Sequence, residues 1–186
     1  MDKRIIDSIN SLSDENSKII IAIEGSCASG KTTLSKEFEK IFNCNVIHMD
    51  DFFLPFEMRT EDRMKEIGGN IDYERFKAEI AENITDDYEF SYGKFDCSTG
   101  KISKNVIIKP KKINVIEGVY CMHPEYDHIY NLRIFLEIDD DEKIRRLRNR
   151  SPEKLERFMN EWIPKENSYF DAFKIKKKCD LILKNN

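Results

Sequence analysis

The sequence predicts an α/β fold, a three-layer α/β/α arrangement in which helices cover both faces of a parallel sheet. Apolar runs of strand length alternate along the 186 residues with segments whose apolar residues have helical spacing. The runs are near-continuous, as in Lys18 to Glu24 (KIIIAIE), which is typical of strands buried on both faces of a parallel sheet. Hydrophobic residues make up 40% of the chain, enough for one core, so we expect a single domain over residues 1–186.

The individual elements follow from the same patterns. The expected strands are residues 18–24, 45–49, 113–117, 132–138 and 179–183. The expected helices are a short N-terminal helix over residues 2–13 and helices over 31–42, 59–67, 72–83, 140–150 and 153–176. Asp72 is a suitable N-cap. Apolar residues alternate at Tyr88, Phe90 and Tyr92 before a turn-rich stretch, so we expect a small hairpin insertion near residues 88–108.

Composition excludes several classes of protein. The 31 basic and 35 acidic residues give a net charge of −4, which does not favour nucleic-acid binding. The longest apolar stretch is about six residues, against the roughly 20 that a membrane helix needs. The five cysteines form no CxxC pair and fit a reducing compartment. We therefore expect a cytoplasmic protein without nucleic-acid or membrane partners, and the sequence leaves a homo-oligomer open.

Charge is uneven along the chain. Residues 142–178 contain 12 basic and 6 acidic side chains, whereas residues 49–62 contain five acids and one base. Such an arrangement can gather a metal ion and an anionic substrate between the two regions. The alternative is that the acidic and basic regions form two separate solvated faces, and composition alone favours this alternative.

The stretch from Gly25 to Thr32 reads GSCASGKT and matches the phosphate-binding pattern G-x-x-x-x-G-K-[ST] between an apolar strand and an amphipathic helix. Gly25 and Gly30 allow backbone angles at which successive N–H groups point at phosphate oxygens. Lys31 can reach the β- and γ-phosphates, and the Thr32 hydroxyl can bind Mg²⁺. We therefore expect a P-loop NTPase fold that binds ATP and Mg²⁺, with Lys31 as a catalytic residue. The expected nucleotide-binding residues are Gly25, Ser26, Cys27, Ala28, Ser29, Gly30, Lys31, Thr32 and Thr33.

A second motif indicates what the nucleotide is used for. Asp50 and Asp51 come directly after the expected strand 45–49, and ligands of open α/β sheets bind at the carboxyl ends of the strands. An aspartate there, near an Mg²⁺ held by Thr32, can orient or deprotonate an acceptor hydroxyl. An aspartate that only caps a turn is the alternative. Beside the P-loop we favour the functional interpretation for Asp50, and less so for Asp51.

Taken together, these motifs resemble those of uridine kinases and related small-molecule kinases. The resemblance rests on the P-loop, on VIHMDDFF at residues 46–53, NID at 70–72, VIEG at 115–118 and the arginine-rich segment 145–150, and it covers roughly residues 18–183. It implies an ATP- and Mg²⁺-dependent phosphotransferase that acts on a hydroxyl of a small molecule, in one domain with an acceptor-side insertion over about 52–108 and a lid over about 140–152.

The resemblance also implies roles for particular residues. Asp50 is expected to be the catalytic acid/base and a metal-linked residue, and Glu117 a second carboxylate near the metal. Asp72 is expected to hold sugar hydroxyls, and Phe53 and Tyr88 to contact the acceptor. Arg146 and Arg150, four apart on one helix face, resemble the lid that closes over the triphosphate; a solvated helix face is the alternative. The expected metal ligands are Thr32, Asp50 and Glu117, and the expected acceptor-binding residues are Asp50, Phe53, Asp72, Tyr88 and Glu117.

The acceptor itself is less well determined. Where uridine kinases place a histidine beyond the aromatic residue, this chain reads Ser91 to Lys94 (SYGK), so we expect uridine to be a poor acceptor. A nucleoside is the preferred acceptor class. The alternatives are a sister metabolite kinase with a pantothenate-like, sugar or sugar-phosphate acceptor, and a regulator that binds ATP without turnover.

Overall fold

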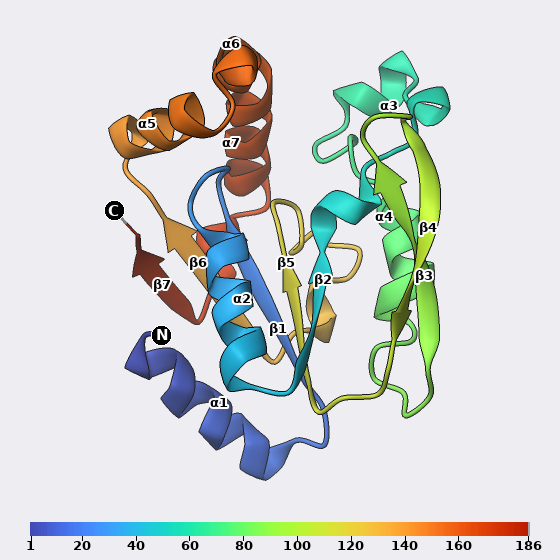
Figure 1. The fold of residues 1–186 in the computed structure, drawn as a ribbon, viewed down its shortest axis with the longest axis vertical. Coiled ribbons are helices and arrows are strands. Elements are labelled where there is room, and N and C mark those ends of the chain that lie inside the picture. The colour runs from blue at the N-terminus through green and yellow to red at the C-terminus, as the bar shows by residue number, and fades with distance from the viewer. Residues whose placement is uncertain (186) are drawn as a thin grey trace.

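A computed structural model describes residues 1–185 and shows one five-stranded parallel sheet between helices, with a separate two-stranded hairpin (Figure 1). The strand order is β2-β5-β1-β6-β7, and every neighbouring pair is parallel. The strands are β1 (Ile19–Gly25), β2 (Cys44–His48), β5 (Ile113–Glu117), β6 (Leu132–Glu137) and β7 (Leu181–Lys184). The predicted α/β fold and its five strands are confirmed.

Strand β1 separates two hydrophobic cores because its side chains alternate between the faces of the sheet. Ile19, Ile21 and Ile23 point to the face covered by α1 (Lys3–Glu15) and α2 (Lys31–Ile41), the face seen in Figure 1. Ile20 and Ala22 belong to the core on the opposite face. The uninterrupted apolar run that predicted a buried strand therefore serves both cores.

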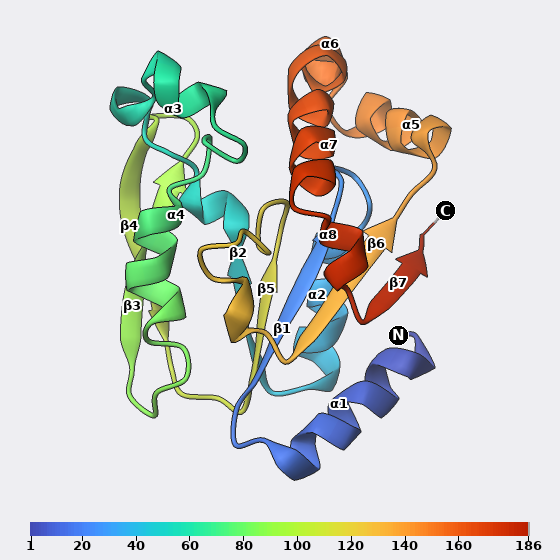
Figure 2. The same cartoon turned by 180° about the vertical axis from the view of Figure 1, so that it is seen from behind.

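The opposite face, seen in Figure 2, is covered by α8 (Ile175–Lys178), the adjoining end of α7 (Ile163–Ala172) and the segment between β5 and β6. Tyr169 and Ile175 from these helices and Tyr126 from that segment are fully buried against the sheet. Helices therefore lie on both faces, and the predicted three-layer arrangement is confirmed.

The insertion between β2 and β5 holds the predicted hairpin, formed by β3 (Phe90–Asp96) and β4 (Lys101–Ile108) in antiparallel register. Before it come α3 (Glu61–Lys65) and α4 (Tyr73–Phe76), the latter continuing as a π-helical turn over Lys77–Ala81. Both helices are shorter than predicted, and the first ends where Glu66 adopts an extended conformation before Gly68 and Gly69. The aromatic ring of Phe52 packs against Phe76 and Tyr92 and attaches the insertion to the sheet.

The C-terminal helical region differs from the single helix predicted for residues 153–176. It consists of α6 (Leu155–Arg157), a π-helical turn over Phe158–Trp162, α7 and α8, after α5 (Asp140–Arg150). Lys174 adopts a left-handed conformation with φ of 52°, which separates α7 from α8. The spacing of apolar residues did not reveal the π-helical turn or the boundary at Lys174, because apolar residues at helical spacing continue through both. No helix within residues 1–185 is long and apolar enough to cross a membrane.

Candidate active site

The P-loop joins β1 to α2 and has the backbone geometry of an anion-binding nest. Gly25, Ala28 and Gly30 have φ of 143°, 60° and 97°. A methyl group on Gly25 would lie 2.5 Å from the carbonyl oxygen of Leu136, so β6 approaches too closely for any other residue there. Where right-handed and left-handed backbone conformations follow one another, successive N–H groups point into one concave site. Such a site suits a phosphate group. The conformations predicted for both glycines are confirmed.

The Lys31 side chain lies along this loop. Its Nζ donates to the carbonyl oxygens of Gly25 at 2.7 Å and Ser26 at 2.9 Å, and the residue is buried. Lys31 is also the first residue of α2, whose N-terminal N–H groups carry partial positive charge. The loop therefore presents an ammonium group, a helix terminus and backbone N–H groups together.

Glu117 connects the P-loop to the end of the neighbouring strand. It is the last residue of β5, and its Oε1 accepts hydrogen bonds from the Thr32 hydroxyl at 2.9 Å and pairs with Nδ1 of His48 at 2.7 Å. The hydrogen bond to Glu117 raises the pKa of His48. Burial acts to raise the pKa of Glu117, but the hydrogen bond and charge of His48, together with the charge of Lys31 and the hydrogen bond from Thr32, lower it. Glu117 is thus held as a carboxylate beside the Thr32 hydroxyl, which the sequence predicted to bind Mg²⁺.

The two adjacent aspartates point into different environments. The exposed Asp50 side chain lines the pocket above the P-loop. The pocket walls raise the pKa of Asp50 by burial, and the charge of Lys31 opposes this rise. Asp51 is 4% exposed and accepts from the Tyr92 hydroxyl at 3.0 Å, while Lys94 forms an ion pair with it at 3.0 Å. Asp50 is therefore available for chemistry, whereas Asp51 anchors the hairpin, as the weaker prediction for Asp51 implied.

One pocket of about 1050 Å³ extends from the P-loop to the insertion. One wall comes from the P-loop, β5 and α5 to α7, and the other from the insertion (Figure 1). Of the residues predicted to bind nucleotide, metal or acceptor, those lining it are Cys27, Ala28, Gly30, Lys31, Thr32, Thr33, Asp50, Phe53, Glu117, Arg146 and Arg150. The structure thus brings most of the predicted site into one cavity.

The two arginines predicted to form a lid stand on α5 beside the P-loop. Arg146 donates from Nη1 to the Ala28 carbonyl oxygen at 3.3 Å and pairs through Nε with Glu142 at 2.7 Å. The Arg150 guanidinium lies 5.7 Å from the ring centre of Phe158. Both side chains therefore line the pocket from one helix, as does Arg145, which pairs with Glu142 through two nitrogens.

In the structure Asp72 forms the N-cap of α4. This residue is not among those that line the pocket. Its carboxylate caps α4 by accepting from the Arg75 backbone N–H at 3.1 Å and pairs with the Arg75 Nε at 3.3 Å. Arg75 also donates to the backbone oxygens of Asp51 and Gly93. These contacts give Asp72 the N-cap role predicted from its position in the sequence, and its contact with sugar hydroxyls stays a prediction.

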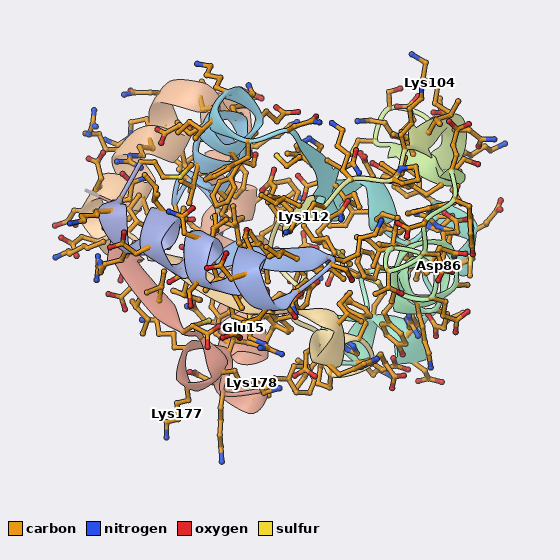
Figure 3. All side chains as sticks on the ribbon, turned by 90° about the horizontal axis from the view of Figure 1, so that it is seen from below. Glu15, Asp86, Lys104, Lys112, Lys177 and Lys178 are labelled. Carbon is orange, nitrogen blue, oxygen red and sulfur yellow. The ribbon has the colours of Figure 1, made fainter. Side chains whose placement is uncertain are left out.

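The structure corrects the placement of Tyr88. Its side chain is 51% exposed and its hydroxyl donates to Asn83, and it does not line the pocket. The neighbouring Asp87 pairs with Lys18, the residue before β1, at 2.8 Å. This segment therefore lies at the amino-terminal edge of the sheet, opposite the P-loop, on the underside where Figure 3 labels Asp86. The hairpin runs along the domain, and only its tip reaches the pocket.

Sequence reasoning missed two buried carboxylates behind the P-loop. Glu24 is fully buried and accepts from the Gly25 N–H at 3.1 Å and the Tyr169 hydroxyl at 3.1 Å. Burial raises its pKa to about 7. An acid inside an otherwise apolar strand was the available signal. Glu166 on α7 accepts from the Cys27 N–H at 2.9 Å, and no spacing along the chain indicated that contact.

Comparison with known proteins identifies the family. The family model of the AAA domain matches residues 21–169. The chain belongs to this family. It is 31% identical over 142 residues to nicotinamide riboside kinase 2 of Mus musculus. The aligned region covers 72% of this chain and 69% of that protein. It is 24% identical over 151 residues to the uridine kinase of Ligilactobacillus salivarius (strain UCC118), covering 70% of this chain and 65% of that protein. The predicted resemblance to uridine kinases is confirmed, and the chain is a P-loop kinase of this kind.

Solved structures support the same fold. A protein described as a possible uridine kinase from Bacillus stearothermophilus superposes with a TM-score of 0.67 at 18% identity, covering 97% of this chain and 99% of that one. D-glycerate 3-kinase from Cryptococcus neoformans gives a TM-score of 0.52 at 12% identity, covering 80% of this chain and 78% of the other. These likenesses confirm the P-loop kinase fold.

Proposed function

We propose that this domain transfers the γ-phosphoryl group of ATP to a hydroxyl of a nucleoside-like small molecule. The observation that carries the proposal is the position of Asp50. Its carboxylate shares one pocket with Lys31 and Thr32 of the P-loop and has no ion pair within residues 1–185. A regulator that binds nucleotide without turnover needs no such carboxylate in an acceptor pocket, so Asp50 favours the enzyme.

The residues present suit a magnesium–nucleotide complex. Mg²⁺ prefers oxygen ligands and is commonly bound by one or two protein groups together with substrate phosphates and water. The Thr32 hydroxyl and the Glu117 and Asp50 carboxylates supply such oxygens in the same pocket. Within residues 1–185 no group of three metal-ligating side chains forms a complete protein site. The proposed ligands are therefore Thr32, Asp50 and Glu117, and the ion would neutralise phosphate charge when the nucleotide is bound.

Each protein group then has a defined task. The P-loop N–H groups and Lys31 bind the phosphates, and Arg146 and Arg150 place positive charge over them from α5. Asp50 orients the acceptor hydroxyl and accepts its proton as the bond to phosphorus forms.

The acceptor half of the pocket is built from aromatic side chains. Phe53, Phe56, Phe95 and Trp162 line it, and Phe53 and Phe56 each pack edge-on against Phe95. Flat rings of this kind hold an aromatic or heterocyclic group by stacking. Nicotinamide riboside and uridine, on which the named relatives act, are molecules of this class, and we extend that class to this chain.

The test is a screen for ADP release over nucleosides, vitamins and sugars, with the phosphorylated product identified by mass spectrometry. We expect a nucleoside or related heterocyclic alcohol to be phosphorylated by the wild type and not by Asp50→Asn. Lys177→Gln is the matched control, because this side chain projects into solvent away from the pocket (Figure 3). ADP release that never depends on an added alcohol, or an active Asp50→Asn variant, would contradict the proposal.

A further inference from the structure

Basic side chains outnumber acidic ones in the lining of the pocket. Its lining includes eight basic and four acidic side chains. The basic residues are Lys31, Arg59, Arg145, Arg146, Arg150, Lys154, Arg157 and Lys165, and the acidic residues are Asp50, Glu117, Glu161 and Glu166. Lys31 and the arginines of α5 lie at the P-loop end and serve the triphosphate. The remaining four cations lie toward the insertion and α6, and the lining acid that forms ion pairs with members of this group is Glu161.

Glu161 does not neutralise this acceptor-side group. Its carboxylate pairs with Arg157 at 2.9 Å and with Lys165 at 3.0 Å, so its single charge is divided between two cations. Within residues 1–185 Arg59 and Lys154 form no ion pair at all. Two cations without an acidic partner therefore line the acceptor half of the pocket.

Arg59 is fixed and partly withdrawn from water. Its Nε donates to the Leu54 carbonyl oxygen at 2.8 Å, and the guanidinium lies 4.6 Å from the ring centre of Phe56 and 5.8 Å from that of Phe95. Burial and the like charge of Arg157 lower the pKa of Arg59, and the charge of Glu161 opposes this only in part. A half-buried guanidinium held in place with free N–H groups beside another cation is unfavourable in an empty pocket and favourable once an anion binds.

Arg59 and Lys154 stand on opposite walls of the same cavity. Arg59 precedes α3 in the insertion, and Lys154 precedes α6 on the other wall (Figure 1). Cys97, at the tip of the hairpin, lines the same pocket as Asp50, Arg59 and Lys154. Burial and the charges of Asp50 and Asp96 raise the pKa of its thiol, and the charges of Lys154 and Arg59 oppose this rise.

We propose that the phosphoryl acceptor carries a carboxylate or a phosphate besides its reacting hydroxyl, and that this anionic group binds between Arg59 and Lys154. The inference rests on the proposed function and specifies its substrate class. Binding of the anion would relieve the repulsion across the pocket and draw the insertion toward α6. A positively charged acceptor, such as nicotinamide riboside with its pyridinium ring, would meet like charge at the same place and bind poorly, so within the heterocyclic class of the proposed function we expect an anionic acceptor rather than a cationic one.

The experiment measures binding separately from turnover. The protein is first saturated with Mg²⁺ and a non-hydrolysable ATP analogue, so that the P-loop is occupied. Calorimetry then compares uridine, orotidine, which adds a carboxylate to the uridine scaffold, and uridine 3′-monophosphate, which adds a phosphate and keeps the 5′-hydroxyl. Acetate and inorganic phosphate serve as minimal probes of the same two anions, and alkylation of Cys97, followed by peptide mass spectrometry, reports whether the anion reaches this position.

We expect at least one anionic probe to bind in a single site, to protect Cys97 and, on the uridine scaffold, to bind more tightly than uridine. Arg59→Gln and Lys154→Gln should each weaken that binding by about tenfold or more, because each removes a charge-assisted hydrogen bond. Affinity for the ATP analogue should stay unchanged, and Lys177→Gln should bind as the wild type does.

The inference is overturned if neither anion binds, if uridine binds as tightly as its anionic analogues, or if both glutamine variants keep the preference. Failure of the proposed function looks different, because it would appear as absent ADP release in the acceptor screen whatever the anion binding. A protein that binds the anionic probe at Cys97 but transfers no phosphate would retain this site and lose the proposed reaction.

Discussion

Asp50 and Asp51 are adjacent in sequence, yet the structure predicts opposite consequences for the same substitution at the two positions. Asp51→Asn replaces a buried carboxylate whose two oxygens serve two donors, the Tyr92 hydroxyl and the Lys94 ammonium. An amide offers one acceptor oxygen, so one donor faces an NH₂ group instead. Asp50→Asn changes a side chain that lines the pocket and holds no ion pair within residues 1–185.

The magnitudes follow from burial. Lys94 is 47% exposed, so its ion pair contributes little, at most about 1 kcal/mol. The unsatisfied buried hydrogen bond costs about 1–3 kcal/mol. A total near 2 kcal/mol corresponds to a fall in Tm of about 4–8 °C for a chain of this size. Asp50→Asn should leave Tm nearly unchanged and lower kcat by about 10²–10⁴, the usual contribution of a general base.

Thermal denaturation and ADP release, measured on both variants with the same acceptor, test this pair of expectations. Each variant is the control for the other, because the chemical change is identical and the positions differ by one residue. Equal losses of kcat in both variants at unchanged Tm would refute the assignment of Asp51 to structure. A large fall in Tm for Asp50→Asn would show that its carboxylate stabilises the fold.

Three further predictions concern the P-loop, the buried acid behind it and the cap of α4. Lys31→Ala should fold but lose turnover by orders of magnitude, because transition-state charge on the phosphate loses its partner; near-normal ADP release would refute this. Burial raises the pKa of Glu24 from 4.5 to about 7, so the stability from its protonated form is complete below pH 4.5 and is lost as pH rises through 7. Glu24→Gln should flatten that dependence in denaturation experiments, and an unchanged pH profile would contradict the assignment. Asp72→Ala should lower stability by about 0.5–2 kcal/mol through loss of the cap without changing the acceptor KM, whereas a raised KM would restore the predicted sugar contact.

Several features of the site could be predicted because the residues that form them are close together in sequence. The P-loop is a strand, a turn and a helix within one short segment, and its glycines, Lys31 and Thr32 adopt the predicted arrangement through local backbone geometry alone. The position of Asp50 follows equally directly, since the carboxyl ends of parallel strands lie at one edge of a sheet. Glu117 ends the strand next to β1 for the same reason.

The acceptor half of the pocket was decided by tertiary structure. Asp72 and Tyr88 lie in an insertion whose orientation on the sheet is set by the packing of Phe52 on Phe76 and Tyr92, and no local pattern specifies that orientation. Once packed, the hairpin carries Tyr88 to the far edge of the domain.

The same packing brings together charges that are remote in sequence. Arg59 and Lys154 are about a hundred residues apart, and Glu166 accepts from the Cys27 N–H across 139 residues. The sequence determined the chemistry of phosphate binding because hydrogen bonding and backbone conformation act locally. Which side chains face one another across the pocket depended on burial of distant apolar surfaces, and only the folded chain shows it.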